Sequence, residues 1–332
     1  MDENKIKNEY KTILFYRYVN ISEENVKELH KVLKAVCDVL GLKGRILVAR
    51  EGINGTVEGK IEAVETFKKH ILSYKHFRKM DIKESVSGGE SFPKMKVKIK
   101  DEIVATKYPK HIDPTKKTGK HINAAEVKKL FEKNEEFYVV DMRNDYEIKG
   151  GHFKNTVNVD WPMKASRDLP KLMKELEQYK DKKVLTVCTG GVRCEKMSAY
   201  LLDQGFKDVS QLHNGIHTYM LRYPGQDFKG TLYTFDNRMT MDFADEKGIP
   251  REVVGECFAC ERDGVKTKTE KYGHCAFTMC HQHLLLCDKH LSGNTDPLGH
   301  EPVFCTDQCK HDHETVQTRV QNYMSSAVGV EQ

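Results

Sequence analysis

The chain of 332 residues has no hydrophobic run long enough to cross a bilayer, and its longest apolar stretches, such as Val184–Val187, are the length of a strand. Its first residues, MDENKIKNEYK, lack the apolar segment of a secretory signal and are too acidic for an obvious transit peptide. We therefore expect a cytoplasmic protein with no membrane partner. No dinucleotide-binding glycine motif and no two-histidine-one-carboxylate iron site is evident, so residue patterns alone assign no cofactor-binding residues and predict no oxygenase.

The net charge is also small, at +5. A charge of this size permits binding to nucleic acid without requiring it. Lysines concentrate at residues 94–100 (KMKVKIK) and 107–120. Such runs are most often a solvated surface. The first run is nevertheless our candidate for an RNA-contacting face, although the same lysines would also protect an edge strand from pairing.

Ten cysteines are distributed very unevenly along the chain. Cys37 stands alone, Cys188 and Cys194 flank one glycine-rich loop, and the other seven lie between Cys257 and Cys309. In a cytoplasmic protein such a cluster indicates metal binding rather than disulfide bonds.

Residues 1–107 alternate strand and helix patterns. A β-branched and aromatic run at Ile13–Val19 precedes an amphipathic helix that Ser22 opens and Gly41 closes. Arg45–Ala49 then predicts a buried strand and Glu51–Thr56 a turn. With a second helix and further strand residues, the order βαββαβ indicates an α+β, ferredoxin-like domain, a scaffold that identifies no function by itself.

Residues 121–232 follow a different pattern, in which short apolar strands alternate with helices. We expect strands at Phe137–Val140, Val157–Val159, Val184–Val187 and Val209–Leu212, and a helix from Glu195. This pattern indicates an α/β domain with a parallel sheet. In residues 233–332 hydrophobic periodicity fades, and this cysteine-rich tail has too few core residues to fold without metal.

The most distinctive segment is the loop that Cys188 opens, CTGGVRC, between the strand VLTV and a helix. A nucleophile at the carboxyl end of a parallel strand lies where open α/β sheets bind ligands. Two glycines let several backbone N–H groups face inward, and the helix dipole reinforces this anion-binding cradle. Arg193 adds positive charge nearby, so we expect a Cys188 thiolate. Cys194 is left as an alternative nucleophile, a resolving partner for Cys188 or a small helix residue.

The same loop, CTGGVRCEKMSAYLLDQGF, resembles the active-site loop of rhodaneses, which carry sulfane sulfur as a cysteine persulfide. Upstream, Asp141, Arg143 and Glu147 match the DxR…E pattern of that domain. Downstream, Asn214 stands where rhodaneses usually have glycine, and we expect it in the left-handed conformation that asparagine tolerates.

Over nearly its full length the chain resembles the oxygen-dependent tRNA uridine hydroxylases, which combine an acylphosphatase-like domain, a rhodanese domain and a cysteine-rich tail. The matching segments are Arg45–Gly55 (RILVAREGING), Asp141–Phe153, Cys188–Lys196 and the tail cysteines. The resemblance implies tRNA as partner, hydroxylation of the wobble uridine (U34) to 5-hydroxyuridine, and molecular oxygen as co-substrate.

For this activity we expect Cys188 and Arg193 to be the catalytic residues. A thiolate or persulfide at Cys188 would add to C6 of uracil and activate C5 toward an electrophilic oxidant. The alternative at the same site is a sulfurtransferase that passes persulfide sulfur to a protein or small-molecule acceptor. A catalytically silent binding module is a further alternative, which the intact cysteine argues against.

The tail contains four closely spaced ligand pairs, namely Cys257 and Cys260, Cys275 and Cys280, Cys287 and His290, and Cys305 and Cys309. Short spacings present two side chains to one tetrahedral ion, so we expect structural zinc. These eight ligands suffice for two ions, paired in sequence or crosswise. The family usually has cysteine at the position of His290, and His274, His281 and His283 are alternative ligands. We expect the tail to support structure or tRNA contact rather than catalysis.

Overall fold

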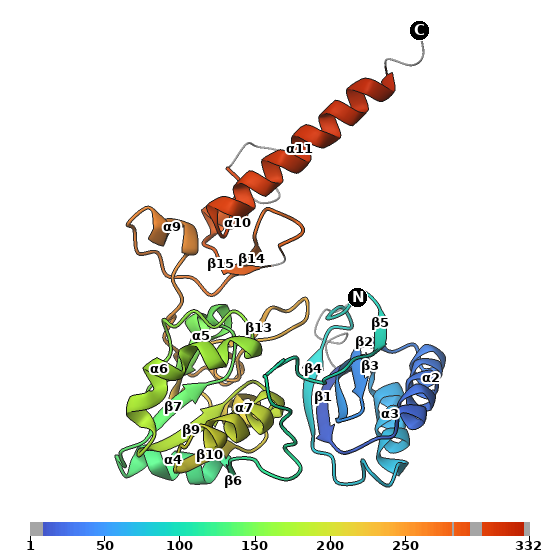
Figure 1. Cartoon of the computed structure of the whole chain (residues 1–332), viewed down its shortest axis with the longest axis vertical. Helices are drawn as coiled ribbons and strands as arrows, with labels where there is room; N and C mark the ends of the chain where they lie inside the picture. The colour runs from blue at the N-terminus through green and yellow to red at the C-terminus, as the bar shows by residue number, and fades with distance from the viewer. Residues whose placement is uncertain (1–8, 281, 293–300, 329–332) are drawn as a thin grey trace.

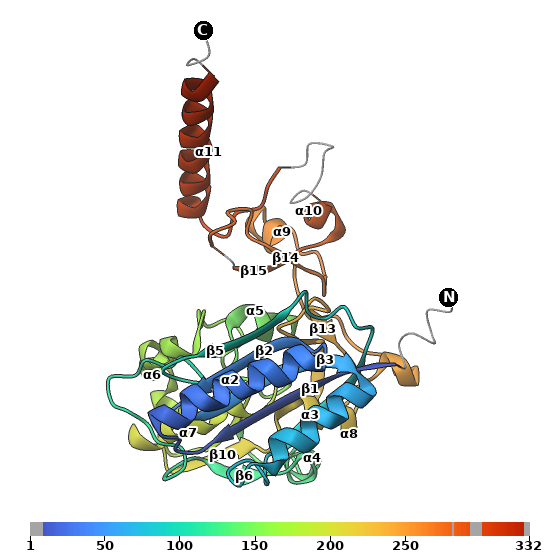
Figure 2. The same ribbon diagram turned by 90° about the vertical axis from the view of Figure 1, so that its right-hand side faces the viewer.

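The computed structural model describes residues 9–280, 282–292 and 301–328. Figure 1 shows an N-terminal α+β part in blue to cyan, a central α/β part in green and yellow, and the cysteine-rich part in orange and red. The last of these ends in α11 (Asp307–Val328), which projects away from the rest of the molecule in both views (Figures 1 and 2). Among the described helices, none is long and apolar enough to span a membrane.

The N-terminal part is a five-stranded sheet in the order β4-β1-β3-β2-β5. Its elements are β1 (Tyr10–Tyr18), α2 (Glu23–Val39), β2 (Lys43–Ala49), β3 (Gly52–Lys60), α3 (Ile61–Ser73), β4 (Ile82–Ser87) and β5 (Met95–Ile99). The βαββαβ order and the ferredoxin-like arrangement are confirmed, but β4 closes this order, whereas the sequence pattern predicts its last strand over Met95–Val104, of which only β5 forms. β5 is an added edge strand, and its Lys96 and Lys98 are exposed.

Strand alternation gives this sheet two different faces. Ile13 and Phe15 of β1 are fully buried and pack in the core with α2 and α3. Thr12, Leu14 and Tyr16, which alternate with them, face the central part of the molecule. Figure 2 shows the two helices covering the outer face of the sheet. The inner face is therefore free to build a site with the central domain.

The prediction of a turn over Glu51–Thr56 is wrong, because the chain turns at Arg50 and Glu51 and β3 begins at Gly52. Gly52 has φ +140°, and a Cβ there would lie 2.0 Å from the carbonyl oxygen of Arg17. Glycine is therefore required by close approach to the neighbouring strand rather than by a turn. β3 pairs with both β1 and β2, so the glycine-rich segment forms a central strand of the sheet.

The central part contains a sheet in the order β6-β10-β9-β7, and all three of its strand pairs are parallel, as predicted. Its elements are β6 (Lys120–Ile122), α4 (Ala124–Glu132), β7 (Tyr138–Asp141), α5 (Asp145–Gly150), β8 (Gly151–Phe153), β9 (Lys183–Val187), α7 (Val192–Asp203), β10 (Asp208–Leu212) and α8 (Gly215–Arg222). Asn214 has φ 65°, which confirms its expected left-handed conformation.

Two local predictions in this part are only partly right. The strand expected around Val157–Val159 is reduced to an isolated parallel bridge between Thr156 and Val139. α7 begins at Val192 rather than at Glu195, since Gly191 has φ +99° and ends the loop in a left-handed conformation. Arg193 and Cys194 are therefore in the first turn of the helix.

The cysteine-rich part consists of short elements and little core. It contains α9 (Phe258–Arg262), β14 (Tyr272–His274), β15 (His283–Leu285) and α10 (Asp288–Ser292), preceded by β11 (Phe228–Gly230), β12 (Leu232–Tyr233) and β13 (Thr240–Met241). Its buried apolar cluster is small and includes Cys257 beside Leu284, Leu286 and Val303. Tyr272 attaches it to the central domain by donating a hydrogen bond to the carbonyl oxygen of Tyr146, at 2.8 Å.

Ionic contacts fix the N-terminal sheet against α7. Lys196 Nζ lies 2.7 Å from Glu51 Oε2 and 2.8 Å from Glu102 Oε1, and its side chain is 1% exposed. Beside it, the Tyr16 hydroxyl donates to Glu195 Oε1 at 3.1 Å. The Glu51 segment and the helix after Cys188, which are far apart in sequence, are therefore joined by a buried cation.

Replacing Lys196 by methionine should lower the free energy of unfolding by about 3 kcal/mol, because two partly buried carboxylates lose their cation. Lys182→Met is the matched control, since Lys182 pairs with Glu136 at an exposed site and its loss should cost less than about 1 kcal/mol. Urea titration followed by circular dichroism measures both. Equal effects of the two substitutions would contradict a buried interdomain anchor.

Candidate functional site

Cys188 follows the last residue of β9 and precedes α7, at the carboxyl edge of the parallel sheet. The side chain is fully buried. The backbone N–H of Gly191 donates a hydrogen bond to Cys188 Sγ at 3.2 Å. The loop therefore curls around the sulfur as predicted, and a backbone donor faces it.

The surroundings of Cys188 favour its thiolate. Burial acts to raise its pKa, but hydrogen bonding from the Cys194 thiol, the charge of Arg193 and the backbone N–H groups of residues 193 and 194 outweigh burial and lower the pKa to about 6. Burial raises the pKa of Cys194, and the neighbouring Cys188 raises it further. The surroundings therefore favour the thiolate at Cys188 and the neutral thiol at Cys194.

Arg193 is held by a carboxylate rather than free. Its two terminal nitrogens donate to Glu147 at 2.6 and 2.9 Å, and Nη2 also donates to Thr189 Oγ1 at 3.1 Å. Glu147 is fully buried, so the pair is a bidentate ion pair shielded from water. The expected positive charge near Cys188 is present, and Arg193 acts on Cys188 as part of a pair that also fixes the loop through Thr189.

The other two residues of the DxR…E pattern, Asp141 and Arg143, hold the backbone on which Glu147 lies. Arg143 donates to both carboxylate oxygens of Asp141 and to the carbonyl oxygen of Gly151, at 2.5 Å for the last contact. Both charged side chains are fully buried. Arg143 and Asp141 therefore fix the segment that leads into α5, where Glu147 is located.

A cavity of about 340 Å³ lies between the N-terminal sheet and the Cys188 loop. We call it the interdomain cavity. The sheet contributes Thr12, Leu14, Tyr16, Arg45, Asn54 and Lys83, the central domain contributes Thr189, Gly190, Arg193 and His217, and the segment between β12 and β13 contributes Phe235 and Arg238, among others. Its volume is in the range of small-molecule sites. The loop that contains Cys188 thus forms part of the wall of the cavity.

The sulfur of Cys188 lies behind this wall, because the N-terminal sheet packs directly on the loop. A Cβ at Gly190 would lie 2.6 Å from a methyl carbon of Leu14, and one at Gly191 would lie 2.9 Å from the hydroxyl oxygen of Tyr16. Larger residues at these two positions would push the sheet away. Both glycines therefore serve domain packing as well as the curl of the loop.

The sequence did not single out several residues that line the cavity, notably Lys83, His217 and Arg238. Lys83 is 6% exposed, and its ammonium lies 4.8 Å from the centre of the Tyr16 ring. Strand alternation places Lys83 on the inner face of β4, but a charged residue there predicts a solvated surface until a second domain is known to cover it.

The tail brings all eight predicted metal ligands into two groups. One contains Cys257, Cys260, Cys287 and His290, and the other contains Cys275, Cys280, Cys305 and Cys309. In each group the ligand atoms lie within 4.8 Å of one another, so each could hold a metal ion. The first pair joins the third and the second joins the fourth, which selects the crosswise arrangement. His290 completes the first group rather than His274 or His283, and His281 is outside the described residues.

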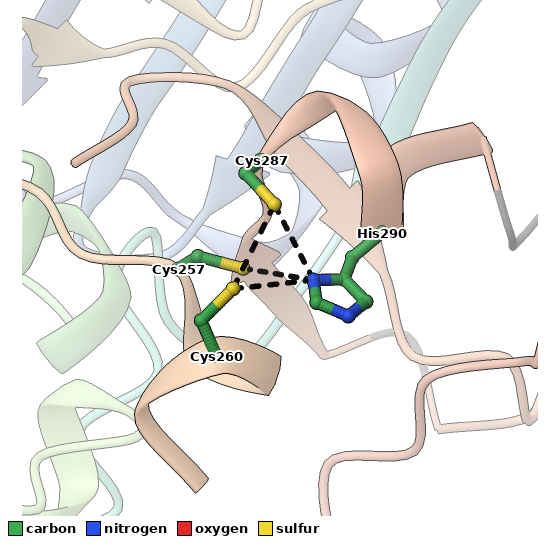
Figure 3. A group of neighbouring side chains, drawn as sticks. All are labelled: Cys257, Cys260, Cys287 and His290. Atoms are coloured by element: carbon green, nitrogen blue, oxygen red, sulfur yellow. Dashed lines mark hydrogen bonds between the residues drawn. The ribbon is translucent and has the colours of Figure 1, made fainter. Parts of the chain in front are cut away.

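Figure 3 shows the first group, in which Nδ1 of His290 faces the three sulfurs. Nδ1 lies 3.4 Å from Cys257 Sγ, 3.5 Å from Cys260 Sγ and 3.3 Å from Cys287 Sγ, and the sulfurs of Cys260 and Cys287 are 3.8 Å apart. In the second group Cys305 Sγ lies 3.5 Å from the sulfurs of both Cys280 and Cys309. The four ligand atoms of each group therefore surround one common point, at which a metal ion could bind.

Comparisons with known proteins cover most of the chain. Family models match at residues 10–103 (UPF0176 acylphosphatase like domain), 123–221 (Rhodanese-like domain) and 229–310 (Rhodanase C-terminal). A Cytophaga hutchinsonii protein named tRNA uridine(34) hydroxylase is 39% identical over 280 residues, which are 84% of this chain and 85% of that protein. Proteins of the same name from Bacillus licheniformis and Staphylococcus aureus are 37% identical (86% of this chain, 85% of theirs) and 36% identical (91% and 90%).

Iodoacetamide reaches Cys188 only when the interface opens, but at a fixed reaction time its alkylation should still rise with pH about a midpoint near the pKa of about 6 and level off above it, because only the thiolate reacts. Peptide mass spectrometry measures the labelled fraction. Cys37 is the internal control, since burial raises the pKa of its thiol to about 12 and it should stay unlabelled at neutral pH.

Removing the positive charge should shift the Cys188 profile toward alkaline pH. We expect Arg193→Gln combined with Glu147→Gln, which avoids leaving Glu147 buried without its partner, to slow labelling at neutral pH by about tenfold. An unchanged midpoint would show that the Arg193–Glu147 pair as a whole does not stabilise the thiolate.

Proposed function

The chain belongs to the family of tRNA uridine(34) hydroxylases, and we propose that it converts the wobble uridine of tRNA to 5-hydroxyuridine with Cys188 as the catalytic residue. The observation that carries this proposal is the combination of a thiolate-stabilising loop with a cavity of about 340 Å³ that residues of the same loop help to line. A tRNA substrate also fits the cytoplasmic location expected from the sequence.

The reactive step that this geometry supports is addition of the Cys188 thiolate to C6 of uracil. The sulfur forms a bond to C6, and the electron pair of the C5–C6 double bond moves through C4 onto O4, which leaves an enolate with a nucleophilic C5. Molecular oxygen is the proposed oxidant at C5. Because its second atom leaves as water, the overall reaction also consumes two electrons and two protons, which we assign to a small-molecule thiol that is oxidised to a disulfide. Loss of the C5 proton and departure of the Cys188 thiolate from C6 then restore the C5–C6 double bond.

Access to the sulfur requires movement at the interface, since Leu14 and Tyr16 pack against the glycines of the loop. The groups that hold the thiolate in place, Arg193 with Glu147, lie on the side of the central domain. Movement of the Leu14 and Tyr16 side chains away from the loop would open a path from the cavity to the sulfur while Lys196 keeps the sheet docked and the thiolate-stabilising contacts stay in place.

Free cations around the cavity suit the phosphates of an RNA loop. Arg45 and Arg167 line the cavity, are exposed, and form no ion pair with another residue in the described part of the chain. Arginine binds phosphate by paired hydrogen bonds. Bases in a single-stranded anticodon loop are already accessible, so a wobble base can enter a pocket without opening a duplex.

Deletion of the gene from its host should remove 5-hydroxyuridine-derived nucleosides from a subset of tRNAs, which mass spectrometry of tRNA digests measures directly. The wild-type gene should restore them, whereas Cys188→Ser should restore less than about 1% because it lacks the thiolate nucleophile. If tRNA nucleosides are unchanged while thiosulfate-dependent sulfur transfer is lost, the protein is a sulfurtransferase instead.

For the tail we propose two structural zinc ions. Zinc bonds of about 2.3 Å to sulfur and about 2.0 Å to nitrogen, in a tetrahedron, place two sulfurs about 3.8 Å apart and a sulfur and a nitrogen about 3.5 Å apart. The separations of 3.8 Å between Cys260 and Cys287 and 3.5 Å between Cys260 and His290 fit these values. Four protein ligands per ion leave no position for substrate, which supports a structural role.

Elemental analysis should give two zinc ions per chain, and Cys260→Ser or Cys309→Ser should each reduce this to one, because the two substitutions affect different groups. Chelation should remove hydrogen-exchange protection from residues 257–280 and 301–309 while β9 keeps it, since metal binding provides much of the folding energy of the tail. A metal-free tail with intact protection would contradict the proposal.

A further inference from the structure

Three buried polar groups line the interdomain cavity without a hydrogen-bond partner among the described residues: Thr12 Oγ1, Lys83 Nζ and His217 Nδ1. Their side chains are 3%, 6% and 6% exposed. A buried polar group without a partner costs about 1–3 kcal/mol, and native proteins contain few of them. Three such groups around one cavity indicate that something bound in the cavity supplies their partners.

The three groups come from separate elements and face the same space. Thr12 is on β1 and Lys83 on β4, which pair antiparallel with Lys83 opposite Leu14. His217 is on α8 of the central domain. Neither domain alone contains the complete set, so the set exists only when the N-terminal sheet is docked.

Their charge states at neutral pH are distinct. Burial, together with the charges of Lys83 and Arg238, lowers the pKa of His217 to about 4, so its imidazole is neutral. Burial also lowers the pKa of Lys83, to about 8, while the charges of Asp81, Cys188 and Glu195 oppose this effect, so most of the ammonium stays protonated. The cavity therefore offers an obligate donor at Lys83 and two groups, a hydroxyl and a neutral imidazole, that can each donate or accept.

The edge of uracil presents the complementary series, with acceptors at O4 and O2 and a donor at N3–H between them. Cytosine presents a donor at C4 and an acceptor at N3, so a fixed ammonium facing the C4 substituent would attract uracil and repel cytosine. RNA-binding proteins commonly read single-stranded bases through this edge. The donor set of the cavity thus distinguishes the two pyrimidines.

We propose that Lys83, Thr12 and His217 read the edge of the wobble uracil, with Lys83 donating to O4 and the other two binding N3–H and O2. This inference rests on the proposed function, since it takes the uridine of the anticodon loop as the occupant. Contact at O4 has a second consequence, because negative charge develops there when the thiolate adds to C6. Lys83 is therefore both a specificity-determining residue and a stabiliser of the enolate.

The test measures binding of an anticodon stem–loop RNA to the full-length protein on a Cys188→Ser background, by fluorescence anisotropy. Lys83→Met should weaken binding of the U34 RNA by about 30-fold or more, and Thr12→Val and His217→Phe by about tenfold each, because each removes one hydrogen bond to the base. Melting temperatures should stay equal or rise, since each substitution replaces an unpartnered buried polar group by an apolar one.

Thr231→Val is the matched control. Thr231 is also 3% exposed and has an unpartnered hydroxyl, but it does not line the cavity. This substitution should change affinity for the RNA by less than about twofold. If Thr12→Val behaves like Thr231→Val, ordered water rather than a base satisfies Thr12, and the inference is overturned.

Base preference provides the second readout. The Cys188→Ser protein should bind a U34 stem–loop about 100-fold more tightly than the same RNA with cytidine at position 34, and Lys83→Met should reduce this preference to about fivefold or less. A preference that Lys83→Met leaves unchanged overturns base reading by Lys83, even where the gene deletion confirms uridine hydroxylation. Unchanged tRNA nucleosides after gene deletion would instead overturn the proposed function.

Discussion

The buried ion pairs of Lys196 with Glu51 and Glu102 are the contact on which the rest of the site depends. They fix the N-terminal sheet on α7, directly after the Cys188 loop, with separations of 2.7 and 2.8 Å. In this docked position Leu14 and Tyr16 cover the loop, and β1 and β4 close the interdomain cavity. Neither contact is possible when the sheet is undocked. The two most distinctive sequence segments, around Glu51 and Cys188, are thus two sides of one interface.

Within that interface the chemistry depends on keeping a sulfur anionic although it is fully buried. Desolvation alone would raise the pKa of Cys188, and the Cys194 thiol, Arg193 and backbone donors reverse the effect. Glu147 keeps Arg193 in position but also offsets part of its charge. The Cys194 hydrogen bond and the backbone N–H groups therefore matter as much as the arginine. Cys194, whose role the sequence leaves open, is best explained as a thiol that donates to the thiolate.

Local patterns predicted the βαββαβ order, the parallel sheet and the Cys188 loop, because strand alternation, helix caps and a glycine-rich loop are local properties. These local patterns gave wrong predictions where a contact between residues far apart in the sequence determines the structure. Glu51–Thr56 resembles a turn because of its glycines, yet Gly52 is needed for close approach to Arg17 in a neighbouring strand. The crosswise metal-ligand pairing and the inward position of Lys83 likewise require knowledge of which segments meet in space. The eight tail ligands were found from spacing alone because each pair is local.

The central claim is that the Cys188 thiolate attacks C6 of a uridine held in the interdomain cavity. An anticodon stem–loop RNA with 5-fluorouridine at position 34 tests it most directly, because fluorine at C5 cannot leave as a proton does and the thioether to C6 persists. Mass spectrometry of the digested complex should find the RNA base attached to Cys188 in the wild-type protein, and no such adduct with Cys188→Ser. An adduct on another residue, or none under conditions in which the RNA binds, would contradict the account.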